Sequence, residues 1–125
     1  MSMANILLVE PDTTLGSVYK QALERAGNTV HWRKTAASAV NALDQLSIDV
    51  LILEIQMAVH NGIELLYEIR SYTDWNAVRV VLHTDIRSSR IDDRARRDLG
   101  IEQVLYKSDT SLAQLCEAVT ASKVI

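Results

Sequence analysis

The chain has 125 residues, with 13 basic and 16 acidic side chains and a formal net charge of −3. This length suits a single domain over residues 1–125, and 48% hydrophobic residues argue against a disordered chain. No apolar run approaches the roughly 20 residues of a membrane span, the mild acidity gives no reason to expect nucleic-acid binding, and a single cysteine, Cys116, favours a reducing compartment. We therefore expect a cytoplasmic globular domain.

Short apolar runs alternate with longer segments of helical period along the chain. The runs that predict strands are 6–9, 30–33, 50–53, 78–82 and a fifth around Val104 and Leu105. Apolar residues at three- and four-residue steps predict helices with stripes over 15–26, 39–46, 63–70 and 112–119, and a weaker stripe predicts one over 88–99. Asp12 and Thr35 stand at N-cap positions, and Gly27 and Gly100 end helices. Such alternation builds a parallel sheet with helices on both faces.

The polar chemistry of the chain is expected at the carboxyl ends of these strands, where sheets of this kind form their binding sites. Acidic groups from two strands, a hydroxyl and a lysine lie there, in the set Glu10, Pro11, Asp12, Glu54, Thr84 and Lys107. His83, which precedes the threonine, is expected at the rim of the same pocket. Asp12 is interpreted as a helix cap rather than as part of the site.

This arrangement resembles the receiver domain of two-component response regulators, in order and spacing, over essentially the whole chain. The resemblance implies an α/β, flavodoxin-like (βα)5 fold, a doubly wound sheet of five parallel strands in the order 2-1-3-4-5. It also implies a site where Mg²⁺ assists formation of an aspartyl phosphate. Thr84 and Lys107 match the family pattern, and Glu10 occupies its first acidic position.

Two departures from the family pattern affect the same chemical step. Pro11 stands where the family has a metal-ligating acid, and proline has no carboxylate. Glu54 stands at the phospho-accepting position, where its extra methylene moves the carboxylate by roughly 1.5 Å, and misplacement on this scale can cost about 10²-fold in rate. We therefore predict a pseudo-receiver that is not an enzyme and uses no cofactor. The alternative is an active receiver that takes phosphate from a histidine kinase with Mg²⁺.

Two interpretations of Glu54 beside Lys107 remain open. In one, the longer glutamate reaches the place of a phosphoryl oxygen, and the pair imitates the phosphorylated domain. In the other, the two charges only neutralise each other in a half-buried site. A further alternative is an unrelated enzyme that uses the acidic cluster, which would need a larger substrate pocket.

Contacts with partners are expected on the fourth helix, fifth strand and fifth helix. The resemblance places Val104 at the family's switch aromatic, so the relay from threonine to aromatic is predicted to be lost, with Tyr106 nearby. Arg90, Arg94 and Arg97 form either an interaction patch, which would pair with acids on a second copy, or a solvated helix face. The partner is expected to be a histidine kinase, an output protein or a second copy, with no direct contact to nucleic acid or membrane.

Overall fold

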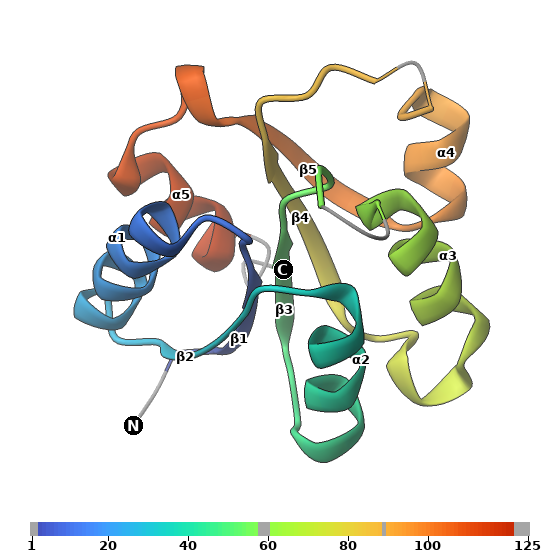
Figure 1. Cartoon of the computed structure of the whole chain (residues 1–125), viewed down its shortest axis with the longest axis horizontal. Helices are drawn as coiled ribbons and strands as arrows, with labels where there is room; N and C mark the ends of the chain where they lie inside the picture. Colours follow the sequence, from blue (N-terminus) through green and yellow to red (C-terminus); the bar gives the residue numbers. More distant parts are fainter. Residues whose placement is uncertain (1–2, 58–60, 89, 122–125) are drawn as a thin grey trace.

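The computed structural model describes residues 3–57, 61–88 and 90–121. Within these ranges the chain forms one sheet in which every neighbouring pair of strands is parallel. The strands are β1 (Asn5–Val9), β2 (Thr29–Arg33), β3 (Val50–Leu53), β4 (Arg79–Thr84) and β5 (Ile101–Tyr106). Their order is β2-β1-β3-β4-β5, which confirms the predicted fold class and strand order (Figure 1).

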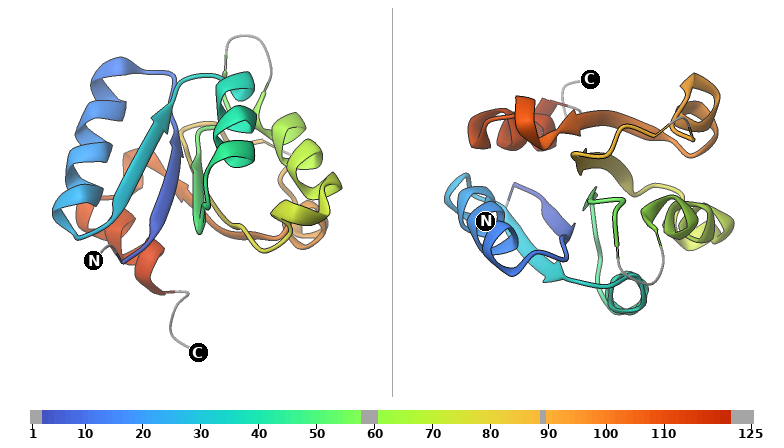
Figure 2. Two further views of the ribbon diagram at one scale, coloured as in Figure 1. Left: turned by 90° about the horizontal axis from the view of Figure 1, so that it is seen from below. Right: turned by 45° about the horizontal axis from the view of Figure 1, so that its top comes forward.

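Helices cover both faces of this sheet. They are α1 (Thr13–Arg25), α2 (Ala36–Gln45), α3 (Gly62–Ser71), α4 (Asp93–Asp98) and α5 (Leu112–Ala121), with short 3₁₀ helices η1 (Thr73–Trp75) and η2 (Lys107–Asp109). α1 and α5 lie on one face, and α2, α3 and α4 lie on the other (Figures 1 and 2). No helix in the described part of the chain is long and apolar enough to cross a membrane.

The apolar strands supply both cores of the molecule. Successive strand residues point to opposite faces, so Leu7 and Leu51 pack beneath α2 and α3, whereas Ile6 and Ile52 pack beneath α1 and α5. Each of these four side chains is at most 1% exposed. This two-sided burial explains why the strands read as continuous apolar runs rather than as alternating ones.

Polar caps and glycines set the helix boundaries as predicted. Asp12 accepts a hydrogen bond from the Leu15 N–H at 2.8 Å, and Thr35 accepts one from the Ser38 N–H at 3.1 Å. Gly27 and Gly100 follow α1 and α4 with φ of 101° and 62°, a conformation that glycine adopts at little cost.

The fourth helix is shorter than predicted. The prediction of a helix over 88–99 is wrong for residues 88 and 90–92, because α4 begins at Asp93; residue 89 lies outside the described residues. The Asp92 carboxylate accepts from the Ala95 N–H at 2.8 Å, and this cap starts the helix after a poorly apolar segment. Ala95 is the one buried residue within α4, so most of this helix faces solvent.

Trp32 holds the start of α1 against β2. Its indole N–H donates to the Glu10 carbonyl at 2.9 Å. Its ring lies directly against Gly16 of α1, where an added Cβ would overlap the indole. The close approach of α1 to the sheet edge therefore requires a residue without a side chain at position 16.

The Gly16→Ala variant should be less stable than the parent. Overlap with the Trp32 ring costs about 1–3 kcal/mol, which exceeds the ~1 kcal/mol that alanine gains over glycine inside a helix. Urea unfolding followed by circular dichroism measures the difference. Ser17→Ala, on the next residue of α1, is the matched control and should not lose stability. An unchanged or higher midpoint for Gly16→Ala would contradict this packing.

Candidate functional site

Strand pairing brings Glu10 and Glu54 side by side. β1 and β3 run in register, with Val9 opposite Leu53, and the two glutamates follow these paired residues. The Glu54 N–H donates to the Val9 carbonyl at 3.0 Å, and the Glu10 N–H donates to the Arg33 carbonyl at 3.0 Å. The backbone therefore fixes both carboxylates at the carboxyl edge of the sheet.

Lys107 joins the two carboxylates. Its Nζ lies 2.7 Å from Oε1 of Glu10 and 2.7 Å from Oε1 of Glu54. The other oxygen of each glutamate accepts a backbone N–H two residues further on, from Asp12 and from Gln56, both at 3.1 Å. We call this arrangement the Glu10–Lys107–Glu54 bridge. The predicted pairing of Glu54 with Lys107 is present, and the share taken by Glu10 is an addition that the sequence did not reveal.

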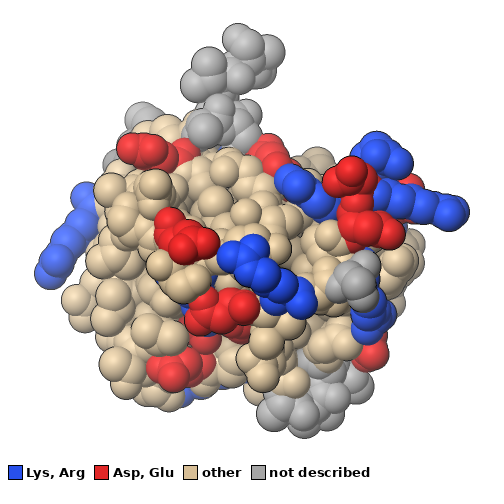
Figure 3. Space-filling view, turned by 90° about the horizontal axis from the view of Figure 1, so that it is seen from above, with Lys and Arg blue, Asp and Glu red and all other residues tan. Residues whose placement is uncertain are grey.

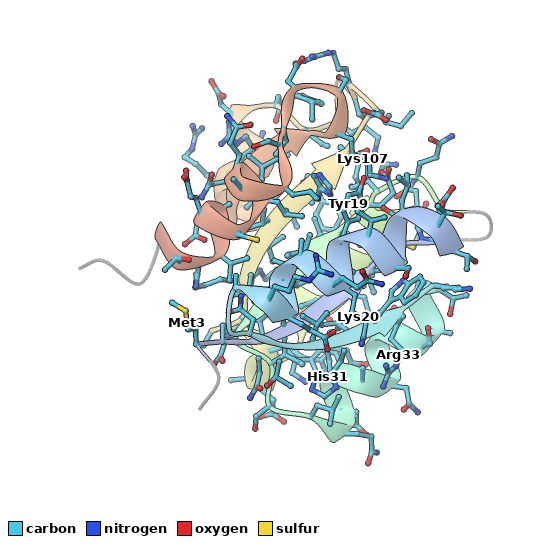
Figure 4. The ribbon with its side chains drawn as sticks, turned by 90° about the vertical axis from the view of Figure 1, so that its left-hand side faces the viewer. Met3, Tyr19, Lys20, His31, Arg33 and Lys107 are labelled. Atoms are coloured by element: carbon cyan, nitrogen blue, oxygen red, sulfur yellow. The ribbon has the colours of Figure 1, made fainter. Side chains whose placement is uncertain are left out.

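The bridge is almost completely withdrawn from solvent. The side chains of Glu10, Glu54 and Lys107 are 3%, 7% and 9% exposed. Burial alone would lower the pKa of Lys107, but the hydrogen bonds and negative charges of the two glutamates outweigh burial and raise that pKa above its usual value. Lys107 therefore carries its positive charge at neutral pH. It lies beside Tyr19 of α1 at this end of the sheet, with Nζ 6.0 Å from the ring centroid (Figure 4).

His83 is buried, and its predicted place at the rim is wrong. β4 extends to Thr84, so His83 is a strand residue and is only 2% exposed. Its ring meets the Tyr19 ring edge-on, with centroids 4.7 Å apart. Burial and the positive charge of Lys107 lower the pKa of His83 from 6.5 to about 4, against the opposing charges of Glu54 and Asp85. His83 is therefore neutral at pH 7.

Thr84 lies at the same edge, as predicted, and is fully buried. Its hydroxyl oxygen accepts from the Ile86 N–H at 3.1 Å, within its own loop. The next residue, Asp85, accepts from the Ser108 N–H at 3.1 Å. The loop after β4 is thus bound to η2, which begins at Lys107.

A second contact between these segments lies outside the bridge. The Arg87 guanidinium stands 3.8 Å from the centroid of the Tyr106 ring, and Arg87 also pairs with Asp109 at 3.4 Å. Val104 is half-buried and packs against the core under α3 and α4. Sequence reasoning named Val104 and Tyr106 but not this role of Arg87, because a cation–aromatic contact between a loop and the end of a distant strand leaves no local pattern.

The predicted arginine patch lies on exposed surface at α4. Arg94 pairs with Asp98 at 3.6 Å, and both side chains are more than half exposed. Arg90 and Arg97 are also exposed. In the view onto the carboxyl edge, basic and acidic side chains lie side by side over α4 (Figure 3). The patch is thus accessible, and its role in binding stays a prediction.

Metal-binding residues do not cluster in the described ranges: no group of three or more His, Cys, Asp and Glu side chains there is placed to hold an ion. Glu10 and Glu54 meet Lys107 instead, and Pro11 offers no carboxylate. The two glutamates of the bridge already have Lys107 as their partner.

Comparisons with a family model and with curated proteins all match response regulators. The response regulator receiver domain model matches residues 6–120. The chain is 34% identical over 105 residues to the transcriptional regulatory protein CpxR of Escherichia coli (strain K12), covering 84% of this chain and 43% of that protein. It is 31% identical over 102 residues to the response regulator protein PmrA of Pseudomonas aeruginosa, covering 82% and 45%. The chain thus spans less than half the length of these relatives.

Solved structures share the fold. The crystal structure of a response regulator receiver domain protein (CheY-like) from Methanospirillum hungatei JF-1 matches with a TM-score of 0.86. The match covers 97% of this chain and 94% of that chain, at 21% sequence identity. Chemotaxis protein CheY4 of Vibrio cholerae matches with a TM-score of 0.84, at 20% identity, over 99% of this chain and 100% of that chain. At sequence identities of 20–21%, this similarity shows the fold alone.

The neutral His83 should make stability depend on pH. The pKa of His83 is 6.5 in the unfolded chain and about 4 in the folded protein. Between these two pH values the unfolded chain binds a proton at His83 and the folded protein does not, so stability falls as the pH drops from 6.5 to about 4. The shift corresponds to about 2 kcal/mol between pH 7 and pH 4.5. Between pH 7 and pH 4.5, the free energy of unfolding of His83→Leu should therefore fall by about 2 kcal/mol less than that of the parent, as measured by urea unfolding.

Titration of the acidic groups is common to both proteins, so the difference between them isolates His83. His31→Gln, at a half-buried position of β2, is the matched control and should keep the parent's pH dependence. Equal losses in the parent and His83→Leu would contradict a lowered pKa at position 83.

Proposed function

The chain belongs to the family of response regulator receiver domains, and we propose that it is a pseudo-receiver that acts through contacts with protein partners. Receiver domains are signalling modules of two-component systems rather than typical enzymes. In this proposal, Glu54 stands in the phospho-accepting position without accepting phosphate. The family's signalling role is kept, and its phosphorylation step is lost.

The Glu10–Lys107–Glu54 bridge is the observation that carries this proposal. A phospho-accepting carboxylate must present a free oxygen as the nucleophile, in line with the leaving group. Both oxygens of Glu54 already accept hydrogen bonds, from Lys107 at 2.7 Å and from the Gln56 N–H at 3.1 Å. The carboxylate is also one methylene longer than the family's aspartate. Both features oppose attack on a phosphoryl donor.

The residues present do not fit the magnesium ion that the family uses. Mg²⁺ requires near-octahedral oxygen ligands at about 2.0–2.1 Å. Glu10 and Glu54 direct one oxygen each at Lys107 and the other at a backbone N–H. Pro11 supplies no ligand from the position where the family has an acid. We therefore derive no step through a metal ion.

For Glu54 beside Lys107, the geometry favours neutralisation over imitation of phosphate. Lys107 divides its hydrogen bonds between two carboxylates instead of binding Glu54 alone. The Thr84 hydroxyl accepts from the Ile86 N–H, within its own loop. Capture of a phosphoryl oxygen by this hydroxyl would need a different loop conformation.

The partner-facing surface in this proposal comprises α4, β5 and α5. It presents the arginines Arg90, Arg94 and Arg97 on one side of β5. The acidic residue Glu117 lies on α5, whereas Glu102 of β5 already pairs with Arg79 at 3.2 Å. Opposite charges on two sides of one face allow a two-fold dimer in which each copy's arginines meet the other's acids. A histidine kinase or an output protein with an acidic surface would use the same arginines.

Phosphorylation is the direct test. We expect the parent to incorporate no acyl phosphate from acetyl phosphate with Mg²⁺, as measured by intact-protein mass spectrometry and Phos-tag gels. The double variant Pro11→Asp, Glu54→Asp restores a metal ligand and the shorter nucleophile, and it should become phosphorylated. Each single variant is a control, because each restores only one of the two parts.

The active-receiver alternative makes the opposite prediction. Stable, Mg²⁺-dependent phosphorylation of the parent would overturn the pseudo-receiver proposal. Peptide mapping would then show whether Glu54 or another acid carries the phosphate.

Charge reversal on α4 tests the partner face. If the partner is a second copy, Arg94→Glu, Arg97→Glu should weaken self-association at least about tenfold, because like charges would then meet across the interface. Sedimentation equilibrium at low and high salt measures the dissociation constant. Arg25→Glu, an exposed arginine at the end of α1, is the matched control. A parent that stays monomeric would exclude the homodimer and leave a different protein as the partner.

A further inference from the structure

We propose that the groove between α2 and α3 is a docking site for a basic amphipathic helix of a partner protein. Two hollows between these helices, of about 400 and 540 Å³, share Ala37 and Val40 as lining residues and therefore adjoin. We call them together the α2–α3 groove, defined by Ala37, Val40 and Asp44 on α2, by Glu68 on α3 and by Trp75 of η1.

This groove is a different surface from those described above. α2 and α3 lie side by side on one face of the sheet, and α3 separates α2 from α4 (Figures 1 and 2). Neither the Glu10–Lys107–Glu54 bridge nor the α4 arginines line the groove. The inference therefore goes beyond the proposed function, and it holds whether or not phosphate is ever transferred.

Small side chains on α2 leave the groove open. The buried side of α2 packs on the sheet through Ala39, Ala42 and Leu43. Its flank toward α3 instead carries Ala37, which is exposed, and Val40, which is half-buried. An alanine ends at Cβ, so this flank does not fill the space between the two helices. A partner's side chains could enter that space.

The walls of the groove follow the two helices. Ala37, Val40 and Asp44 stand at three- and four-residue steps on α2, and Leu65 and Glu68 stand three residues apart on α3. Residues at these steps lie on one side of a helix. Seven residues from position 37 to position 44 span about 10 Å, which is two turns of helix. The groove thus has the shape that accepts a helix laid along it.

An aromatic pair lies at one end of the groove. The rings of Tyr72 and Trp75 are 4.7 Å apart between centroids and tilted by 52°. Trp75 packs against the core, whereas Tyr72 is 51% exposed. The buried ring supports the exposed one, so Tyr72 offers an apolar surface that is already in place. Tyrosine and tryptophan are the residue types that contribute most to protein interfaces.

Charge determines the kind of partner. The acidic side chains of the groove include Asp44, Glu68 and Asp74, all of which are exposed, and among the described residues no lysine or arginine lines it. α2 also ends beside Asp44 without a basic residue in its last turn, so the negative end of its dipole adds to this field. Such a surface repels nucleic acid and anionic membranes. It attracts a protein segment rich in lysine or arginine.

A model helix tests this inference. The probe is a fluorescein-labelled peptide of about 18 residues, or ~27 Å as a helix, with leucine on one face and lysine on the other. Fluorescence anisotropy at about 0.15 M salt should show saturable binding to the parent. The same helix with glutamate in place of lysine should bind at least about tenfold more weakly, because like charges would meet across the contact.

Charge reversal locates the binding. Asp44→Lys, Glu68→Lys should weaken binding of the lysine helix at least about tenfold. Both positions lie in the last turns of their helices, where lysine is favoured, so this variant should fold, as circular dichroism would verify. Glu24→Lys, Glu117→Lys is the matched control, because it changes the net charge equally at exposed positions of α1 and α5. Its affinity should stay within about twofold of the parent's, since it leaves the groove unchanged.

A neutral substitution tests the shape of the groove. Ala37→Phe fills the space beside Val40 without changing charge, and it should also weaken binding several-fold. The inference is overturned if the lysine helix does not bind the parent saturably, or if it binds the groove variants and the matched control equally. Self-association of the parent that only the groove variants abolish, without binding of the helix, would make a second copy the occupant and overturn it too. Phosphorylation of the parent would overturn only the proposed function, because these readouts measure helix binding alone.

Discussion

One ammonium group between two buried carboxylates organises the carboxyl edge of this protein. Buried charges are tolerated only when they are paired and hydrogen-bonded, and here all four carboxylate oxygens have donors. The reach of the lysine matters as much as its charge. β4 lies between β3 and β5 in the sheet, so the Lys107 side chain extends past the end of β4 to reach Glu54 and Glu10. A single side chain thereby connects the ends of strands across most of the sheet.

The bridge is continuous with the surface that we propose faces partners. Tyr106, Lys107 and Ser108 are consecutive. Tyr106 and Ser108 meet Arg87 and Asp85 of the loop after β4, and Lys107 meets the two glutamates. Whatever fixes Lys107 therefore also fixes the neighbours that bind the loop after β4. This contiguity places the buried site next to the loop that leads to α4.

The sequence predicted the features that depend on local pattern. Continuous apolar runs predicted the strands, and the caps at Asp12 and Thr35 were placed correctly. The resemblance supplied the strand order and the meeting of Glu54 with Lys107. The sequence did not predict features that depend on contacts between distant parts of the fold. The share of Glu10 in the bridge requires a lysine to extend past β4. The burial of His83 follows from a strand that continues to Thr84, beyond the apolar run that marked it.

The short fourth helix has a consequence for how this protein meets its partners. Six residues capped by Asp92, with one buried side chain, make few contacts that resist local opening. Amide protons in α4 should therefore exchange with solvent faster than those of the strands. The arginines proposed to bind partners lie on and just before this segment, so complex formation would also order the helix that carries them. Ordering of α4 would consume part of the free energy of binding. The affinity would then depend on the helix propensity of α4 residues that do not contact the partner. Substitutions on the solvent side of α4 would tune binding without changing a single intermolecular contact.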